Sequence, residues 1–303
     1  MRLDDVKDIK RKVVVLGASG YVGNSIVEVL SRDERFIVKG ITSRDIDLTN
    51  EEQVFSKAPD LIKDSIVVMA AAVTPERKEP IIGMLDNIKI SANLAGLINR
   101  HHLSHVIYLS TIDVYGRENL MLPLDETSRI QPSTYYAISK YTSELVLKRV
   151  CLDKKIIYTV LRLPGVYGAG DTHESPIKVF IASAIKGSMV KITGDGSKRR
   201  EFLFINDIPR VLANVILKRF PGIFNVVTGK SHSINHILTL IDSISNKRLE
   251  KIYVKDTEAK LDIVLKKSAL LDVLDDFKFT DLSDGLKSTY DYYCVKQTDS
   301  ANG

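Results

Sequence analysis

The sequence predicts an α/β protein with a doubly wound parallel sheet and a smaller C-terminal α/β lobe. Short apolar runs without polar alternation indicate strands that are buried on both faces. Stretches of helical periodicity separate these runs, and strands that alternate with helices are typical of a parallel sheet. A glycine-rich turn follows the first apolar run directly, at the point where a strand leads into a helix.

The first strand is expected at Lys12–Leu16 (KVVVL), and GASGYVG follows it at once. From Asn24 the apolar residues fall on helical spacing, and a second strand is expected at Phe36–Ile41. Glycines in such a turn let backbone N–H groups meet an anion at a helix N-terminus. The unit therefore indicates a Rossmann-type dinucleotide site. The residues expected to hold the dinucleotide are Gly17, Ser19, Gly20, Tyr21, Val22 and Gly23.

The end of the second strand bears on the choice of dinucleotide. An acidic residue there would accept hydrogen bonds from the adenosine ribose and mark an NAD site. The sequence has Thr42, Ser43 and Arg44 instead, and a guanidinium favours a 2′-phosphate through charge-assisted hydrogen bonds. We therefore expect NADP to be preferred over NAD, the alternative being an Arg44 that meets only solvent. Asp47 and Leu48 follow closely enough to lie against the adenine edge.

The remaining elements continue the alternation and then loosen. Strands are expected at Ile66–Ala72, His105–Leu109 and Ile156–Leu163, and helices at Leu85–Arg100 and Tyr135–Val150. The later elements are expected at Ile177–Lys186, Val190–Thr193, Phe202–Ile205, Ile208–Leu217, Phe224–Val227 and His236–Ile244. We expect a cofactor domain over residues 1–168, a substrate-binding lobe over 169–296 and a flexible tail over 297–303.

Composition excludes fibrous and disordered classes, since 44% of the 303 residues are hydrophobic and 27% are charged. The net charge of +5 is spread along the chain, so we expect no nucleic-acid partner. The longest apolar run, Ile66–Val73, is far shorter than the roughly 20 residues of a membrane span, so we expect no membrane contact. The start, MRLDDVKDIKRK, lacks a signal region, which favours a cytoplasmic location. Neither the cysteines nor the histidines have metal-site spacing, and His232 and His236 look isolated.

Tyr136 and Lys140 stand four residues apart in YAISK, so a helix presents both side chains on one face. An ammonium group beside a phenol stabilises the phenolate, which makes the tyrosine a usable proton donor or acceptor near neutral pH. The pair opens the helix that follows the strand ending in Ser110 and Thr111. We therefore expect a catalytic pair at this edge of the sheet.

Eight segments of the chain resemble the extended short-chain dehydrogenases/reductases, also called the NAD-dependent epimerase/dehydratase family. The similarity runs from Lys12 to about Tyr293. The segments are GASGYVG (17–23), MAAAV (69–73), NIKISANL (87–94), YLSTIDVYG (108–116), YYAISK (135–140), LRLPGVYGAGD (161–171), ITGDGSKRREFLFIND (192–207) and FNVVTGK (224–230). Together they are specific for the family and much less specific for one substrate.

The resemblance implies roles for individual residues. Tyr136 would exchange a proton with a sugar oxygen as hydride moves to or from the nicotinamide, and Lys140 would also hold the nicotinamide ribose. Thr111 matches the hydroxyl residue that binds the same oxygen, with Ser110 beside it as a substitute. Arg200 matches the arginine that pairs with the substrate diphosphate. Further cofactor contacts are implied at Ala70, Ala71, Ala72, Pro164 and Val166.

Other positions depart from the family pattern or allow two interpretations. Asn87 matches a structural asparagine of the fourth helix, and Arg162 is either an internal ion-pair partner or a site residue. Asp113 aligns with the glutamate of the dehydratases, so it is either a substrate-site base or a plain helix N-cap or solvated aspartate. Ile112 replaces the acid that a full dehydratase needs, and Gly165 replaces an asparagine that often contacts substrate.

The resemblance implies an NAD(P)-dependent enzyme that acts on a nucleotide-activated sugar. Arg44 favours the NADPH-dependent reduction of a 4-keto sugar, because a net reductase must exchange its spent cofactor. One alternative is a nucleotide-sugar 4-epimerase or dehydratase with tightly bound NAD. Another is a non-catalytic NADP-sensing or scaffold protein, although such proteins usually lose the tyrosine or the lysine. The apolar helices Leu85–Arg100 and Tyr135–Val150, with the resemblance, predict a homodimer.

Overall fold

A computed structural model describes residues 10–75, 78–116, 122–255, 262–274 and 276–301. Two compact units make up the chain. The first comprises Met1–Gly116, Ile130–Arg162 and Ile208–Phe224, and the second comprises Arg117–Arg129, Leu163–Asp207 and Asn225–Gly303. The units therefore do not divide at residue 168 as the sequence suggested, because residues 208–224 return to the first unit.

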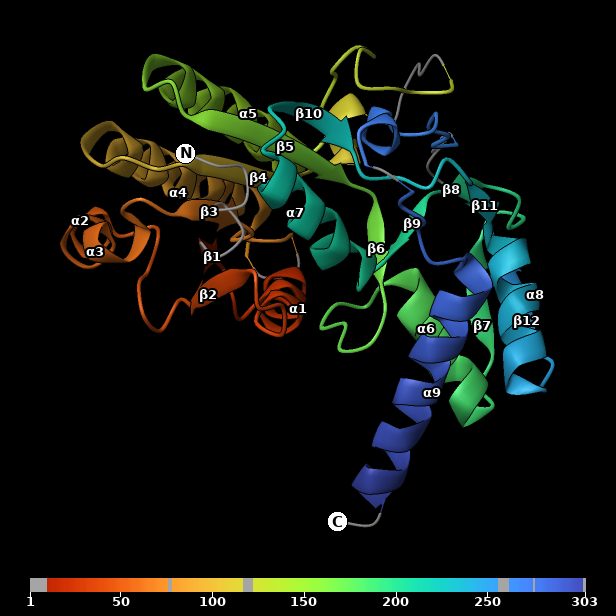
Figure 1. Ribbon diagram of the computed structural model, residues 1–303. Helices are drawn as coiled ribbons and strands as arrows, with labels where there is room; N and C mark the ends of the chain where they lie inside the picture. Colours follow the sequence, from red (N-terminus) through yellow and green to blue (C-terminus); the bar gives the residue numbers. More distant parts are fainter. Residues whose placement is uncertain (1–9, 76–77, 117–121, 256–261, 275, 302–303) are drawn as a thin grey trace. The chain divides into compact units, whose positions relative to one another are not determined.

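The first unit is built on a six-stranded sheet with the order β10-β5-β4-β3-β1-β2 (Figure 1). Its strands are β1 (Arg11–Leu16), β2 (Phe36–Ile41), β3 (Ile66–Met69), β4 (His105–Thr111), β5 (Ile157–Leu163) and β10 (Gly222–Asn225). β1 pairs in parallel with β2 and β3, and β3 pairs in parallel with β4. The strand order reverses at β1, which is the point where doubly wound sheets bind ligands. The predicted fold class is confirmed.

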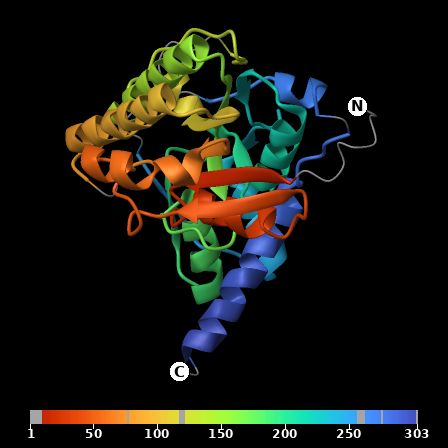
Figure 2. The same ribbon diagram turned by 60° about the vertical axis from the view of Figure 1, so that its left-hand side comes forward.

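Helices pack against this sheet, and their starts follow from local chemistry. They are α1 (Tyr21–Leu30), α2 (Glu51–Lys57), α3 (Pro59–Ile62), α4 (Pro80–Arg100), η2 (Ile112–Tyr115), α5 (Tyr135–Asp153) and α7 (Asp207–Lys218). The Thr134 hydroxyl caps α5 by accepting from the N–H of Ala137 at 3.1 Å. Glu79 caps α4 in the same way, with Pro80 at the first helical position. Figures 1 and 2 both show α4 and α5 side by side.

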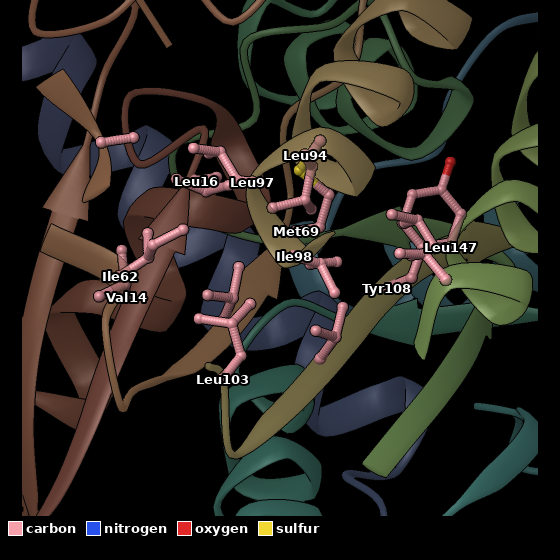
Figure 3. Close-up of a cluster of buried hydrophobic side chains, with 14 of the residues drawn as sticks. Val14, Leu16, Ile62, Met69, Leu94, Leu97, Ile98, Leu103, Tyr108 and Leu147 are labelled. Carbon is pink, nitrogen blue, oxygen red and sulfur yellow. The ribbon is translucent and has the colours of Figure 1, made fainter. Parts of the chain in front are cut away.

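The main hydrophobic core lies between the sheet and these two helices. Strand residues such as Val14, Leu16 and Met69 belong to one buried cluster with Leu94 of α4 and Leu147 of α5 (Figure 3). All of these side chains are almost fully buried, so their transfer from water stabilises the arrangement. This packing holds α4 and α5 at the carboxyl ends of β3 and β4, where the site residues lie.

By length and composition, α4 could cross a membrane, which the sequence analysis did not anticipate because polar residues interrupt its apolar runs. Asn87, Ser91 and Asn93 are buried within this helix. Leu94 and Leu97 belong to the core described above. Packing in the core therefore accounts for part of the apolar character of α4, while Ile81, Ile82 and Leu85 are exposed.

The second unit contains short strands and helices. Among the described residues its strand pairs are β6 (Gly165–Tyr167) with β9 (Phe202–Phe204), β7 (Val190–Thr193) with β12 (Lys251–Val254), and β8 (Arg199–Arg200) with β11 (His232–Ser233). The helices are α6 (Pro176–Lys186), α8 (Ile234–Ser245), η3 (Ala269–Asp272) and α9 (Leu282–Ala301). α9 continues through much of the segment 297–303, for which the sequence suggested a flexible tail.

Candidate functional site

A glycine turn joins β1 to α1. Gly17 has a φ of +88°, and a Cβ there would lie 2.6 Å from the backbone of Ala71. A Cβ on Gly23 would lie 2.1 Å from the carbonyl oxygen of Gly17. The N-cap of α1 is Gly20, which has no side chain to cap the first N–H groups of the helix. These donors and the missing side chains fit the diphosphate of a dinucleotide.

Near this turn the structure shows two buried hydroxyl groups that sequence reasoning missed. Ser19 is exposed at the tip, and Tyr21 and Val22 are half-buried in the first turn of α1. Ser25 Oγ and Thr74 Oγ1 are buried and have no hydrogen-bond partner among the residues that the structure describes. Because a buried hydroxyl without a partner is unfavourable, both suit a hydrogen bond to a ligand. Only their closeness in sequence to GASGYVG and MAAAV could have indicated them.

The turn after β2 lies against the glycine turn, since the N–H of Gly17 donates to the carbonyl of Ile41 at 2.9 Å. Asp45 Oδ2 accepts from the N–H and the hydroxyl of Thr42, at 2.8 and 2.7 Å. These hydrogen bonds lower the pKa of Asp45. An acid therefore stands at the end of β2, which the sequence analysis overlooked because the chain folds back at this turn. Arg44 is exposed beside it.

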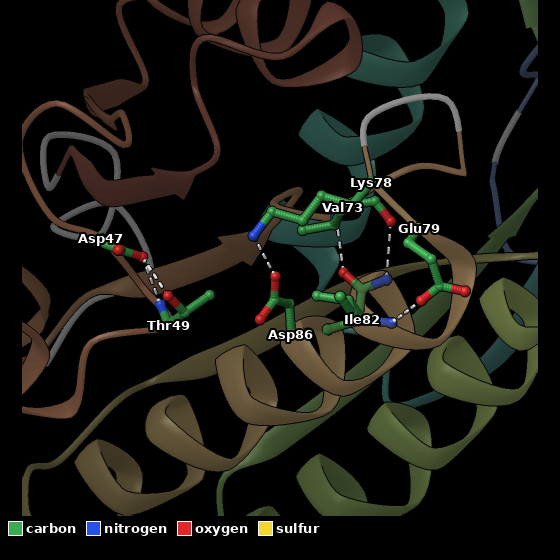
Figure 4. Close-up of polar contacts among 8 residues, drawn as sticks. Asp47, Thr49, Val73, Lys78, Glu79, Ile82 and Asp86 are labelled. Atoms are coloured by element: carbon green, nitrogen blue, oxygen red, sulfur yellow. Dashed lines mark hydrogen bonds and ion pairs between the residues drawn. The ribbon is translucent and has the colours of Figure 1, made fainter.

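Asp47 and Leu48 are each held by a neighbour. Asp47 Oδ1 accepts from the N–H and the hydroxyl of Thr49, at 2.9 and 2.7 Å, which lowers the pKa of Asp47 (Figure 4). Asn93 of α4, which sequence reasoning missed, donates to the carbonyl of Leu48 at 2.8 Å. A cavity of about 640 Å³ lies here, away from the catalytic pair, and is lined by Asp47, Thr49, Asn50, Glu51, Glu52, Phe55, Lys89 and Arg100.

Asn87 of α4 holds the backbone that follows β3. Its Oδ1 accepts from the N–H of Val73 at 2.7 Å (Figure 4), and its Nδ2 donates to the Val73 carbonyl at 3.0 Å and to Ser139 Oγ at 3.1 Å. The structural role expected of Asn87 is confirmed. The bonds fix the half-buried residues Ala70, Ala71 and Ala72, the second of which faces Gly17.

Tyr136 and Lys140 lie in the first two turns of α5. Lys140 is 3% exposed, and its Nζ donates to the carbonyl of Leu109 at 2.5 Å. The same nitrogen lies 4.3 Å from the centre of the Tyr108 ring. Burial lowers the pKa of Lys140 to about 7, and the charge of Glu144 opposes that shift. A lysine in this state changes its charge near neutral pH, next to a half-buried tyrosine.

The two hydroxyls at the end of β4 have different surroundings. Ser110 is buried and donates to Glu144 Oε1 at 2.5 Å. Thr111 is the N-cap of η2, where its Oγ1 accepts from the N–H of Asp113 at 3.1 Å. Thr111 Oγ1 also lies 3.4 Å from Asp113 Oδ2. The N-cap of η2 is therefore Thr111, and Asp113 lies in the first turn of η2 and is not its N-cap as the sequence suggested.

A buried ion pair lies behind these residues. Arg162 of β5 donates to both carboxylate oxygens of Glu144, at 3.1 and 2.7 Å, and donates to the hydroxyl of Tyr115 at 2.9 Å. The side chains of Arg162 and Glu144 are 2% and 3% exposed. Arg162 is thus an internal ion-pair partner, and Glu144, one turn after Lys140, connects α5 to β4 and β5. Sequence reasoning did not single out Glu144.

Three of the predicted site residues belong to the second unit. Pro164 is buried, and Val166 lies on β6, which pairs in parallel with β9. Arg200 ends β8 and stands opposite His232 of β11. Gly165 is exposed, and a Cβ there would meet its nearest neighbour at 3.6 Å, an ordinary contact. Crowding therefore does not explain why glycine replaces the expected asparagine.

One prediction about the histidines is wrong. His232 and His236 are not isolated, because their rings stack with centres 5.2 Å apart and planes 13° apart. The turn from β11 into α8 brings them together. His105 of β4 is buried. Its Nε2 lies 2.8 Å from the hydroxyl of Thr159, which itself donates to the carbonyl of Phe220.

A glycine turn at the strand-order reversal and a tyrosine–lysine pair at the end of β4 define a dinucleotide-dependent enzyme of the Rossmann type. The chain belongs to the NAD dependent epimerase/dehydratase family, whose model matches residues 13–226. It is therefore an enzyme of the extended short-chain dehydrogenase/reductase class that modifies nucleotide sugars and uses NAD or NADP. A non-catalytic scaffold or sensor is not supported.

Relatives within the family have several activities. GDP-6-deoxy-D-talose 4-dehydrogenase of Aggregatibacter actinomycetemcomitans is 27% identical over 288 residues, covering 92% of this chain and 97% of that protein. GDP-L-fucose synthase of Azorhizobium caulinodans is 26% identical over 303 residues, covering 93% and 96%. UDP-N-acetylglucosamine 4-epimerase from Methanobrevibacter ruminantium, solved with UDP-N-acetylmuramic acid, matches with a TM-score of 0.82 and 25% identity over 95% and 99% of the two chains. Other structures with this fold hold NAD or NADPH.

Proposed function

We propose that the protein reduces a 4-keto group of a nucleotide-activated sugar with NADPH. The observation that carries this proposal is Lys140, buried against the carbonyl of Leu109, one helical turn from Tyr136 and beside the strand end that bears Thr111. Such an arrangement can give a proton to an oxygen that gains negative charge. The substrate class follows from membership of the family, and reduction at the 4-keto position is the part that we propose.

Each site residue has its own role in the proposed reduction. NADPH, when bound, supplies a hydride. Tyr136 gives its phenol proton to the carbonyl oxygen of the sugar, so that the ketone becomes an alcohol and the tyrosine is left as phenolate. The ammonium of Lys140 stabilises that phenolate, and the Thr111 hydroxyl holds the same sugar oxygen. In the second unit, Arg200 pairs with the substrate diphosphate, and Pro164 and Val166 offer their backbone to the nicotinamide.

The preference for NADPH rests on Arg44. Its side chain is exposed at the end of β2, beside the glycine turn, and a guanidinium there suits a 2′-phosphate. Asp45 places a carboxylate next to it, but hydrogen bonds from Thr42 engage one oxygen of that carboxylate. One relative, GDP-6-deoxy-D-talose 4-dehydrogenase, carries a name that fits net oxidation or reduction at C4.

One observation favours a second candidate function. Asp45 is the kind of acid that accepts hydrogen bonds from the adenosine ribose of NAD. A nucleotide-sugar 4-epimerase or dehydratase keeps its NAD bound, because the hydride returns to the same substrate. The structural likeness to a 4-epimerase supports this alternative.

Cofactor titration followed by turnover tests the proposal. NADPH and NADH are titrated into the purified protein by nicotinamide fluorescence, and any copurified nucleotide is identified. Reduced-nicotinamide absorbance is then followed with UDP-, GDP- and dTDP-linked 4-keto sugars. We expect tighter binding of NADPH and its consumption with one of these sugars. Tightly held NAD, with no net consumption of NADPH, would establish the epimerase or dehydratase instead.

We also propose a homodimer formed through α4 and α5, in the cytoplasm. Large apolar side chains are exposed on both helices, including Ile82 and Leu85 on α4. On α5 they are Ile138, Leu145 and Leu152, whose seven-residue spacing places them on one face. A second copy would cover these faces. Sedimentation should show a dimer at micromolar concentration, and Leu85→Lys combined with Leu145→Lys should shift it to monomer. A wild-type monomer would contradict the proposal.

A further inference from the structure

The stacked pair His232 and His236 lies next to the residue expected to bind the substrate diphosphate. In the antiparallel pair of β8 with β11, His232 stands directly opposite Arg200. Directly opposed residues place their side chains on the same face of a strand pair. Ser233 then caps α8 by accepting from the N–H of His236 at 3.1 Å, and this turn brings the second imidazole onto the first. Three groups that can carry positive charge therefore share one surface.

The other charges around the pair are mostly positive or already engaged. Burial lowers the pKa of His232, and the neighbouring His236, Arg199 and Lys230 lower it further. Of the described carboxylates nearby, Asp281 pairs with Lys230 at 3.2 Å, and Asp262 accepts from the backbone N–H of Arg199 at 2.8 Å. Asp195, on the loop beside α8, accepts from both the N–H and the hydroxyl of Ser197, at 2.9 and 2.6 Å.

Glu201, the residue next to Arg200, is bound by the turn that follows β10. It is 2% exposed, and its carboxylate accepts from the N–H and the hydroxyl of Thr228 and the N–H of Gly229. Glu201 is therefore engaged by that turn. A surface with several cationic groups, two of which gain their charge only on protonation, suits a bound dianion.

We propose that His232 and His236 bind the substrate diphosphate together with Arg200, so that substrate binds more tightly as the pH falls. The inference rests on the proposed function, in which Arg200 meets the diphosphate. In the free protein, protonation of one ring is opposed by its stacked partner and by the neighbouring cations. A bound diphosphate reverses this balance, because its negative charges favour the imidazolium forms. Binding therefore takes up a proton from solution.

Calorimetry can measure this proton uptake directly. UDP-glucose, GDP-mannose and dTDP-glucose are suitable probes, because their diphosphates keep both negative charges between pH 5.5 and 8. Titrations in buffers of different ionisation enthalpy give the number of protons taken up on binding. For the wild-type protein we expect proton uptake near pH 6.5 and an affinity about tenfold higher at pH 6 than at pH 8, which corresponds to one pKa unit.

Variants test whether His232 and His236 cause the proton uptake. His232→Gln combined with His236→Gln should abolish the proton uptake and flatten the pH dependence, while binding at pH 8 changes little. Each side chain is at least partly exposed, so the variant should fold. The matched control is His102→Gln, an exposed histidine that contacts Asp64 in the first unit, and it should behave as wild type.

Two results would overturn the inference, and they differ in what they say about the proposed function. If the double variant keeps the proton uptake of the wild type, the histidines do not meet the diphosphate, and the proposed reduction stands untouched. If the wild-type protein binds none of the three nucleotide sugars at any pH, the inference and the proposed substrate class both fail.

Discussion

The carboxyl end of β4 and the turn after β2 are expected to serve one cofactor, yet they are built in opposite ways. Around β4 the charged side chains of Lys140, Glu144 and Arg162 are buried and bound to one another or to backbone. After β2 the side chains of Arg44 and Asp45 are exposed. Charges interact strongly where water is excluded and weakly where it is present. Changes near β4 should therefore cost activity or stability, whereas changes after β2 should alter cofactor choice alone.

The largest effect is expected at the proton donor. Tyr136→Phe removes the phenol but keeps the ring, so turnover should fall by about 10² to 10⁴-fold while NADPH affinity stays nearly unchanged. Initial rates and fluorescence titrations measure the two quantities. Tyr135→Phe is the matched control, because Tyr135 is the neighbouring residue and is 45% exposed. Near-normal turnover in Tyr136→Phe, with chemistry rate-limiting, would disprove the assignment.

The buried ion pair should have the next largest effect, and on stability. Arg162→Met leaves the Glu144 carboxylate buried without its partner, which typically costs about 3 to 5 kcal/mol in the free energy of unfolding. Arg149→Met provides the comparison, because its pair with Asp153 is exposed and should contribute less than about 1 kcal/mol. Urea unfolding of both variants measures the difference. Equal losses in the free energy of unfolding would show that the buried pair contributes no more to stability than the exposed pair.

His105 should make stability depend on pH. Burial lowers its pKa to about 4 in the folded protein, against about 6.5 in an unfolded chain. Between these values the unfolded chain binds a proton that the folded one does not, so stability is complete above about pH 6.5 and falls toward pH 4 by no more than about 3 kcal/mol.

Unfolding free energies between pH 7.5 and 4.5 check this slope. His105→Gln should flatten it, because glutamine can still donate to Thr159 but does not titrate. His101→Gln, at the end of α4, should leave the slope as in wild type. Parallel slopes in the wild-type and His105→Gln proteins would assign the pH dependence to other groups.

The smallest effect is expected after β2, and it should concern the cofactor alone. Arg44→Ala should weaken NADPH binding by roughly tenfold to a hundredfold, the range for a charge-assisted hydrogen bond, and leave NADH nearly untouched. Asp45→Asn should act in the opposite direction, because it removes a negative charge near the 2′-phosphate. Lys39→Ala, an equal change of charge on β2, is the control. Tighter binding of NADH by the wild-type protein would overturn the role of Arg44.

The sequence by itself determined the alternation of strands and helices from β1 to β5, apart from the short helices α2, α3 and η2, and the main chemical groups of the site. Local rules are sufficient for these features. The apolar run of β1 indicates a strand buried on both faces, and the spacing in YAISK places Tyr136 and Lys140 on one helix face. Gly17 was recognisable because the glycine motif GASGYVG stands between a buried strand and a helix, and the structure adds that its φ and its closeness to Ala71 exclude a side chain.

Tertiary structure alone decided which partner each side chain meets. The sequence shows Ser110 and Thr111 as neighbouring hydroxyls, and only the structure shows that Ser110 donates to Glu144 on another element. His232 and His236 looked isolated until the turn into α8 stacked their rings. Asp45 reaches the end of β2 because the chain folds back to Thr42. The physical reason is common to all three: hydrogen bonds and ring contacts depend on distances in space, which sequence periodicity does not specify.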